Sequence, residues 1–180
     1  MLQILPSFFL RLIAFLLLQV LVINHIDYIS WLNAMPYIFV LLALPFDLPA
    51  IGVLVLGFVT GLTMDFLTGS YGIHTSACTT LAFIRPLLIV GLANKDVLQY
   101  EIRPTVYSMG LPRFGLYVFL GTLFHHFNLY LLEFFNIARI VDIGIRTSAN
   151  SVFTTVFIVL IAFLIQSKDL RNKHEEFIPR

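Results

Sequence analysis

A carboxylate and an imidazole lie close together in a strongly apolar part of this sequence. Asp65 and His74 flank a short stretch that contains Gly69 and Gly72, and a hydrophobic segment lies on each side. Ionisable side chains are costly inside a bilayer, so they indicate a structural or functional site when they occur there. The spacing places both side chains at equal depth on either side of a turn. We therefore expect an Asp65–His74 hydrogen bond that closes the turn, in preference to a catalytic pair.

Two glycines precede this aspartate at intervals of four residues. Gly57, Gly61 and Asp65 share one face of a helix, because residues four apart in sequence lie one above the other. Glycines leave that face without side chains, and small residues allow two membrane helices to approach closely. The pattern predicts a contact surface for another helix, and a leucine at Gly61 is expected to disrupt folding or assembly.

An arginine followed by a proline occurs in the next hydrophobic segment. Pro86 frees the carbonyl group of Ala82 and is expected to bend a helix. Arg85 has two interpretations: it hydrogen-bonds to carbonyl groups released at that break, or it snorkels to the membrane surface. A small polar stripe above it is expected to face another helix; it consists of Ser76, Thr79 and Thr80.

Two adjacent histidines and a glutamate suggest a metal site at first sight. His125 and His126 point about 100° apart on a helix, and Glu133 lies about 10.5 Å further along it than His126. These side chains cannot chelate one ion together, so a buried hydrogen-bonded pair or a water-filled pocket is the preferred interpretation. Residues 147–151, with Thr154 and Thr155, predict a second small and polar packing face.

The composition indicates an integral membrane protein. Hydrophobic residues make up 59% and charged residues 12% of the chain, whereas soluble domains carry about 25% charged residues. The net charge of +1 gives no attraction to nucleic acid. The single cysteine, Cys78, excludes an intrachain disulfide and a cysteine-built metal site. No phosphate loop, zinc helix or nucleophile elbow is present, so neither an enzyme nor a cofactor is expected.

Hydropathy predicts an all-α bundle of six transmembrane helices that forms a single domain over residues 1–180. About 20 apolar residues are needed to cross a bilayer, and the expected spans cover residues 7–23, 35–46, 49–66, 73–93, 113–134 and 147–166. The second span is short and starts near Pro36. It has three interpretations: tilted, extended toward Trp31, or partly re-entrant. Merging it with the third would move one terminus to the other side.

The distribution of basic residues orients the bundle. Cytoplasmic loops carry an excess of Lys and Arg. With a cytoplasmic N-terminus, that side holds Lys95, Arg103, Arg113, Lys168, Arg171, Lys173 and Arg180, and Arg11 is expected to snorkel toward it. The opposite side holds Arg139 and Arg146. Both termini are therefore expected to be cytoplasmic.

Three groups of residues together resemble the rod shape-determining MreD family of bacterial inner-membrane proteins. They are Gly57-Phe58-x-x-Gly61-Leu62-x-x-Asp65-Phe66, Gly72-x-His74, and Ala82-Phe83-x-Arg85-Pro86. Gly110-Leu111, His125-His126 and Glu133 are similar to features of one branch of that family. We interpret the following as structural or partner-interface residues: Gly57, Gly61, Asp65, Gly69, Gly72, His74, Arg85, Pro86, His126 and Glu133.

The resemblance implies a non-catalytic scaffold in the machinery of bacterial cell elongation, located in the cytoplasmic membrane. Its expected partners are an MreC-like single-span protein and, through it, peptidoglycan synthases and cytoskeletal MreB. The family fold is similar to the substrate-binding membrane subunits of energy-coupling-factor transporters, which gives an alternative function in small-molecule uptake. A third class, the intramembrane hydrolases, requires a nucleophile and a base paired at equal depth, and the sequence offers no such pair.

Overall fold

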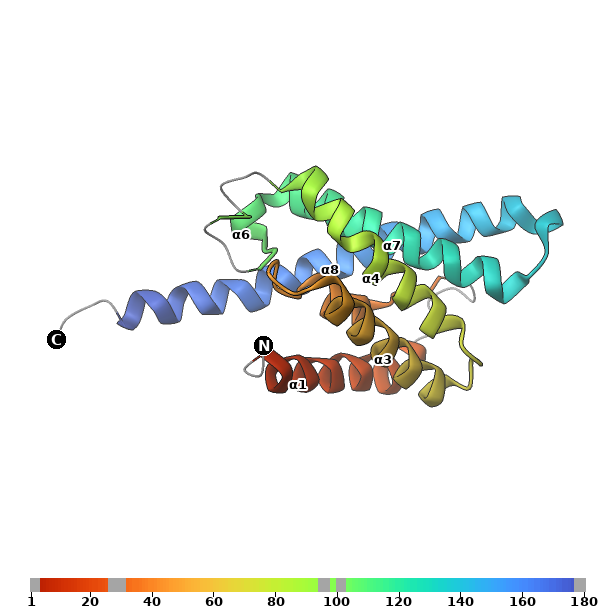
Figure 1. Ribbon diagram of the computed structural model, residues 1–180, viewed down its shortest axis with the longest axis horizontal. Coiled ribbons are helices and arrows are strands. Elements are labelled where there is room, and N and C mark those ends of the chain that lie inside the picture. The colour runs from red at the N-terminus through yellow and green to blue at the C-terminus, as the bar shows by residue number, and fades with distance from the viewer. Residues whose placement is uncertain (1–3, 26–31, 94–97, 100–102, 177–180) are drawn as a thin grey trace.

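The computed structural model describes residues 4–25, 32–93, 98–99 and 103–176, and these form helices and connecting segments without a strand (Figure 1). Helix α1 (Ile4–Leu17) continues through a π-helical turn (Leu18–Val22) and a 3₁₀ turn (Ile23–His25). The other helices are α2 (Phe39–Leu42), which follows a 3₁₀ turn (Pro36–Ile38), α3 (Ala50–Thr68), α4 (Ile73–Leu92), α6 (Val106–Met109), α7 (Leu111–Phe134) and α8 (Ile140–Glu176), which follows a 3₁₀ turn (Ile137–Arg139).

Three helices of the described residues are long and apolar enough to cross a bilayer. They are α3, α4 and the stretch Ile137–Ile165, which includes most of α8. This agrees with the expected class, an all-helical membrane protein. Helix α7 has 24 residues, about 36 Å at 1.5 Å per residue, but its histidines, Asn128 and Glu133 make it less apolar.

Helices α3, α4 and α7 match the expected spans to within two residues, whereas α8 is much longer than expected. It begins at Ile140 and has 37 residues. Hydropathy placed its start at residue 147, because the residues before it include polar side chains. These side chains stabilise the start of the helix: Asn136 caps the preceding turn by accepting from the Ala138 amide at 3.0 Å. The guanidinium groups of Arg139 and Arg146 lie over the Phe134 ring, at 4.9 and 5.3 Å from its centroid.

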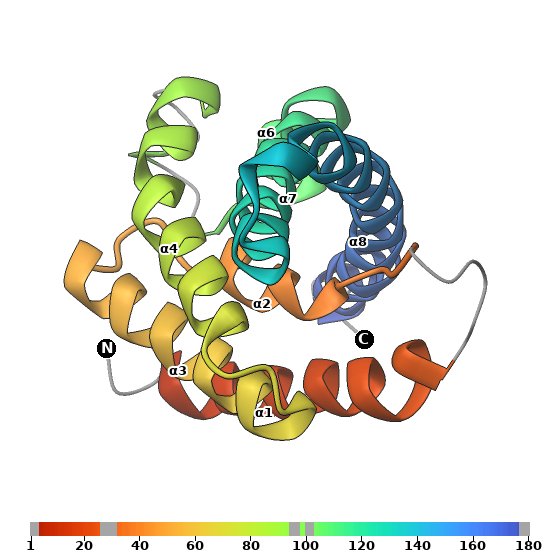
Figure 2. The same ribbon diagram turned by 90° about the vertical axis from the view of Figure 1, so that its right-hand side faces the viewer.

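The second expected span, residues 35–46, contains only a short helix. Its helical part runs from Pro36 to Leu42, seven residues, which is about 10 Å against the roughly 30 Å of a bilayer core. It is covered by the rest of the protein, because Tyr37, Ile38, Leu41 and Leu42 are at most 1% exposed. Figure 2 shows α2 near the centre of the bundle, with α1 below it, α3 and α4 on one side and α8 on the other.

Helices α3, α4, α7 and α8 run in alternating directions, and α1 runs in the same direction as α3 (Figure 1). The main packing pairs are α3 with α4, α4 with α7, and α7 with α8. Helix α1 begins and α8 ends at the same end of the molecule, while the α3–α4 and α7–α8 turns lie at the other end (Figure 1). The motif from Gly57 to Asp65 and the motif from Gly72 to His74 both fall on one hairpin, α3–α4.

Candidate functional site

The glycine face of α3 packs directly on the backbone of α4. A Cβ atom at Gly61 would lie 2.5 Å from the carbonyl oxygen of His74 and 2.7 Å from the Thr75 nitrogen. At Gly57 it would lie 2.7 Å from the Ala82 Cβ. Real Cβ atoms do not approach other atoms so closely. The predicted contact surface is therefore confirmed, and its occupant is a helix of the same chain.

Asp65 caps the N-terminus of α4. Its Oδ1 accepts from the His74 amide at 2.9 Å and from the Ser70 hydroxyl at 2.6 Å. Its Oδ2 accepts from the Thr75 amide at 2.8 Å and from the Thr75 hydroxyl at 2.5 Å. The first amides of a helix have no partner within it and form the positive end of the helix dipole. The carboxylate at the unfavourable end of α3 is thus stabilised by the favourable end of α4.

The prediction of a hydrogen bond between the side chains of Asp65 and His74 is wrong. Asp65 binds the backbone of His74, while the imidazole points elsewhere. The turn explains this arrangement: Gly69 and Gly72 have φ angles of +68° and +95°, values that glycine adopts readily. They fold the chain so that the amides of α4 face the carboxylate, which then has four donors without the ring.

The imidazole of His74 belongs to a second buried group, centred on Tyr37. The Tyr37 hydroxyl lies 2.8 Å from His74 Nδ1 and 2.9 Å from His125 Nε2. Tyr37 and His125 are fully buried and His74 is 8% exposed. Cys78 Sγ is 3.7 Å from His125 Nε2. One hydroxyl from the short helical segment therefore connects α4 and α7 in the interior.

Residues 33–45, which we term the buried segment, have further backbone partners near their start. The amide of Asn33 donates to Asn150 Oδ1 at 2.6 Å, and the amide of Met35 donates to Thr154 Oγ1 at 3.1 Å. Both acceptors belong to α8. A short helix leaves backbone donors without partners, and an interior without water requires the protein to supply them. Asn150 and Thr154 are the members of the predicted polar face, residues 147–151 with Thr154 and Thr155, that take this role.

The end of the buried segment is held in the same way by donors. The Tyr117 hydroxyl of α7 donates to the Leu42 carbonyl oxygen at 2.9 Å. Arg85 of α4 donates through Nη2 to the carbonyl oxygen of Leu44, and that nitrogen lies 3.4 Å from the carbonyl oxygen of Pro45. Side chains from α4, α7 and α8 thus satisfy the backbone of the buried segment at both ends.

Both sequence interpretations of Arg85 are corrected by this geometry. The side chain is 2% exposed, so it does not snorkel. It binds the carbonyl groups that end the buried segment, not the Ala82 carbonyl freed by Pro86. Pro86 lies inside α4, which continues as a helix to Leu92. Leu44 and Pro45 are buried and follow the end of α2, so their carbonyl groups need donors from another element.

His126 and Glu133 do not act together. His126 Nδ1 lies 2.9 Å from the Thr122 carbonyl oxygen and must carry the proton there, so Nε2 accepts from Thr154 Oγ1 at 3.4 Å. Glu133 is exposed. Within residues 4–25, 32–93, 98–99 and 103–176, no group of three His, Cys, Asp or Glu side chains is arranged to hold a metal ion.

Two tyrosines at the centre of this arrangement were missed by sequence reasoning. Tyr37 and Tyr117 are both fully buried, and a buried phenol almost always has a hydrogen-bond partner. Each occurs singly in an apolar stretch, and Tyr37 directly follows the proline that starts a helix too short to span. That combination was the available signal. The stripe above Arg85 faces α7 as expected, through a 3.0 Å hydrogen bond from Ser76 Oγ to Asn128 Oδ1.

The polar contacts of this site join the buried segment to α4, α7 and α8. The Cys78–His125 contact resembles a nucleophile and base, but both residues are fully buried and His125 Nε2 already bonds to Tyr37. In comparisons with known proteins, no family model, no curated protein and no solved structure matches the chain.

Proposed function

We propose that this chain is a non-catalytic scaffold subunit of the bacterial cell-elongation machinery, similar to the MreD family. It binds an MreC-like single-span protein and helps to couple the MreB cytoskeleton to peptidoglycan synthesis. The sequence resemblance supports this proposal. The observation that carries it concerns the α3 residues that resemble the family: some of them face α4, and the others are exposed on the outside of the α3–α4 hairpin.

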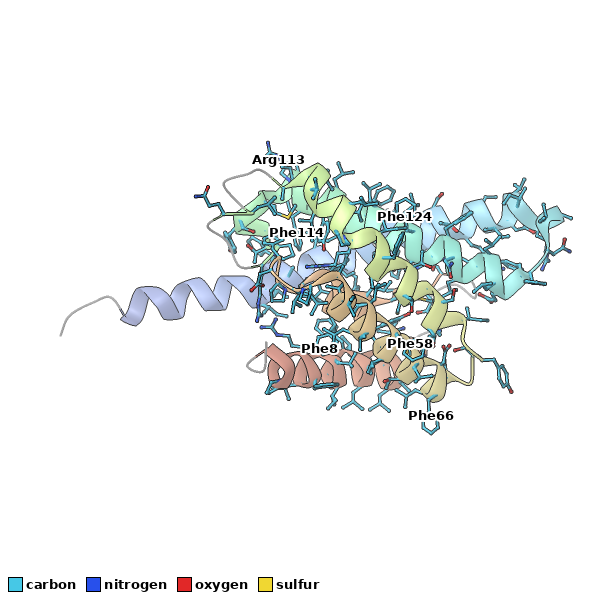
Figure 3. The ribbon with its side chains drawn as sticks, in the orientation of Figure 1. Phe8, Phe58, Phe66, Arg113, Phe114 and Phe124 are labelled. Carbon is cyan, nitrogen blue, oxygen red and sulfur yellow. The ribbon has the colours of Figure 1, made fainter. Side chains whose placement is uncertain are left out.

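The motif in α3 alternates between residues that build the hairpin and residues that point away from it. Gly57, Gly61 and Asp65 face α4. The residue that follows each of them is exposed: Phe58 by 48%, Leu62 by 51% and Phe66 by 88%. Figure 3 shows Phe66 pointing away from the bundle at the lower edge of α3.

The three exposed side chains form one ridge, since they are four residues apart on the same helix. We term Phe58, Leu62 and Phe66 the outer ridge. A rigid ridge beside a fixed glycine face suits helix-to-helix contact, in which packing and not burial from water drives association. The outer ridge is the surface that we assign to the single-span partner.

The proposed topology has six hydrophobic segments in the cytoplasmic membrane, with both ends in the cytoplasm. Helices α1, α3, α4, α7 and α8 cross the bilayer as helices. The buried segment leads the chain back to the cytoplasmic side between α1 and α3 with only a short helix, which makes six passages and leaves both ends in the cytoplasm. Non-helical backbone at membrane depth is tolerated where protein covers it. The basic residues near the ends of α1 and α8 support this orientation.

Site-specific crosslinking tests the proposal. A photoactivatable residue is placed at Leu62, with matched positions at Val156 and Leu160 of α8, which are 54% and 60% exposed. We expect Leu62 to capture a single-span cell-wall protein in rod-shaped cells and the α8 positions to capture none. Depletion of the chain should round the cells.

The alternative, a transporter subunit, gives a different result in the same experiment. Capture of an ATPase module, or co-purification of a vitamin, would replace the scaffold proposal. The convergent polar groups of the interior favour the scaffold, because Tyr37, His74 and His125 bond to one another and to that extent are not available to a ligand.

A further inference from the structure

Two cavities lie between α1 with its continuation and α8, and residues of the buried segment line both of them. We term the two cavities together the groove and the buried segment its floor. The larger cavity measures about 300 Å³. One wall is Ala14 and Phe15 of α1, the floor includes Phe39 and Ala43, and Ile165 of α8 lies on the other side. Figure 2 shows α1 and α8 on different sides of α2.

The groove has a second cavity toward the other end of α1. It measures about 60 Å³ and lies between Ile23 of the 3₁₀ turn that follows α1, Ala34 of the floor, and Phe153 and Phe157 of α8. Phe153 and Ile165 are 12 residues apart along α8, which is about 18 Å. The two cavities therefore mark a path about as long as one leaflet is deep, roughly 15 Å or half of the bilayer core.

Two arginines line the larger cavity at its mouth. They are Arg11 of α1 and Arg103, which precedes α6. Both also line a small adjoining pocket of about 10 Å³, whose other residues include Leu44 and Pro45. Arg85 approaches the carbonyl groups of those two residues from the interior. None of the described residues that line either cavity is acidic.

We propose that this groove binds an anionic phospholipid. The phosphate group lies between Arg11 and Arg103, and one acyl chain follows the apolar groove over Ala14 and Ala43. Guanidinium groups pair well with phosphate oxygens. Basic pockets between membrane helices on the cytoplasmic side commonly hold anionic headgroups, and the positive-inside argument places this end of the bundle there.

The shape of the groove favours a lipid chain over a partner helix. An α-helix with its side chains is about 10 Å wide, so even two turns of it occupy several hundred Å³. The cavities of about 300 and 60 Å³ are too small for that, whereas part of a single hydrocarbon chain fits the larger one. The apolar lining likewise favours a phosphate carried on a hydrocarbon chain over a free anion. Among the described residues, none that lines the cavities belongs to the outer ridge, and the inference rests on the proposed orientation but not on the proposed partners.

Native mass spectrometry of the purified full chain in detergent tests whether lipid binding depends on the headgroup charge and on the two arginines. Phosphatidylglycerol, phosphatidylcholine and inorganic phosphate are titrated separately. We expect one tight phosphatidylglycerol adduct. Arg11→Gln and Arg103→Gln should each weaken its affinity about fivefold, which is the contribution of one basic residue near an anionic lipid. The double variant should weaken the affinity about 25-fold. Arg113→Gln is the control, because Arg113 is exposed at the start of α7 and is absent from the cavity lining.

A second pair of variants tests the apolar path. Ala14→Trp should fill the cavity and displace the lipid, while Ile13→Trp, at a neighbouring exposed position outside the lining, should not. Should Arg103→Gln fail to fold, Arg11→Gln and Ala14→Trp decide the question, since both positions are exposed on α1.

Four results would overturn the proposal. Equal loss of lipid in Arg113→Gln would show a general charge effect. Retention in Ala14→Trp would place the acyl chain elsewhere. Tight phosphate binding without lipid binding would make this a small-anion site. Crosslinking of a partner's span to position 14 in cells would assign the groove to a protein.

Discussion

Asp65 and Thr75 are joined twice, because one carboxylate oxygen accepts from both the backbone amide and the hydroxyl of the threonine, at 2.8 and 2.5 Å. This pair fixes the end of α3 against the start of α4. The carboxylate receives four hydrogen bonds in all. The angle of the hairpin, and with it the direction of the outer ridge, depends on this one side chain.

Asp65→Ala should lower the free energy of unfolding by about 2 kcal/mol, from four hydrogen bonds at about 0.6 kcal/mol each in a membrane protein. Asp65→Asn should be milder, because it keeps one acceptor oxygen. Unfolding of the purified chain in mixed micelles measures both. In double-mutant cycles, Asp65→Ala should couple to Thr75→Val and be additive with His74→Ala. If Asp65→Ala coupled to His74→Ala and not to Thr75→Val, a direct contact between the Asp65 and His74 side chains would be indicated instead.

Gly61→Ala should destabilise the hairpin, because the added methyl group meets the backbone of Thr75 and His74. Overpacking of this kind costs about 1–3 kcal/mol, and Gly61→Leu should prevent folding. Gly115→Ala is the matched control in α7, where no atom beyond the adjoining residues and backbone of α7 itself lies within 4 Å of the added carbon. Thermal denaturation of both variants compares them. Equal stability of the Gly61 and Gly115 variants would contradict the close helix contact.

Arg85→Met should release the end of the buried segment. It leaves the Leu44 carbonyl group without its donor, and a buried unsatisfied polar group costs about 1–3 kcal/mol. Arg85→Lys should be intermediate, because an ammonium group carries fewer donors on a different geometry. A cysteine introduced at Ala43 should react faster with a thiol reagent in Arg85→Met. Arg113→Met, at an exposed position, should change neither the labelling rate nor the stability by more than about 0.5 kcal/mol.

Cysteine labelling tests the orientation. Single cysteines at positions 3 and 175 should be protected from an impermeant thiol reagent added outside intact cells, by the positive-inside argument. Tyr71 is fully exposed in the turn between α3 and α4, and a cysteine there should be modified from outside. The native Cys78 is fully buried and gives no background. Modification at position 3 or 175 from outside would reverse the proposed topology.

The sequence predicted the long helices well and the polar contacts poorly. Hydropathy located α3, α4 and α7 because a run of apolar residues is a local property. Asp65 was correctly expected to need a partner, yet its partners are two backbone amides and two hydroxyl groups, whose positions depend on the turn at residues 69–72. The partners of Arg85 and Tyr37 lie on other elements, 37 to 88 residues away. Such contacts follow from how a segment too short to span is covered, which no local pattern encodes.

The continuity of α8 has a mechanical consequence. One uninterrupted helix connects Asn150 and Thr154, which hold the start of the buried segment, to Glu176 beyond the apolar stretch. Its regular i to i−4 hydrogen bonds resist twisting. A force or a torque applied to the final turns of α8 is therefore transmitted along the helix to Asn150 and Thr154, and through them to the start of the buried segment.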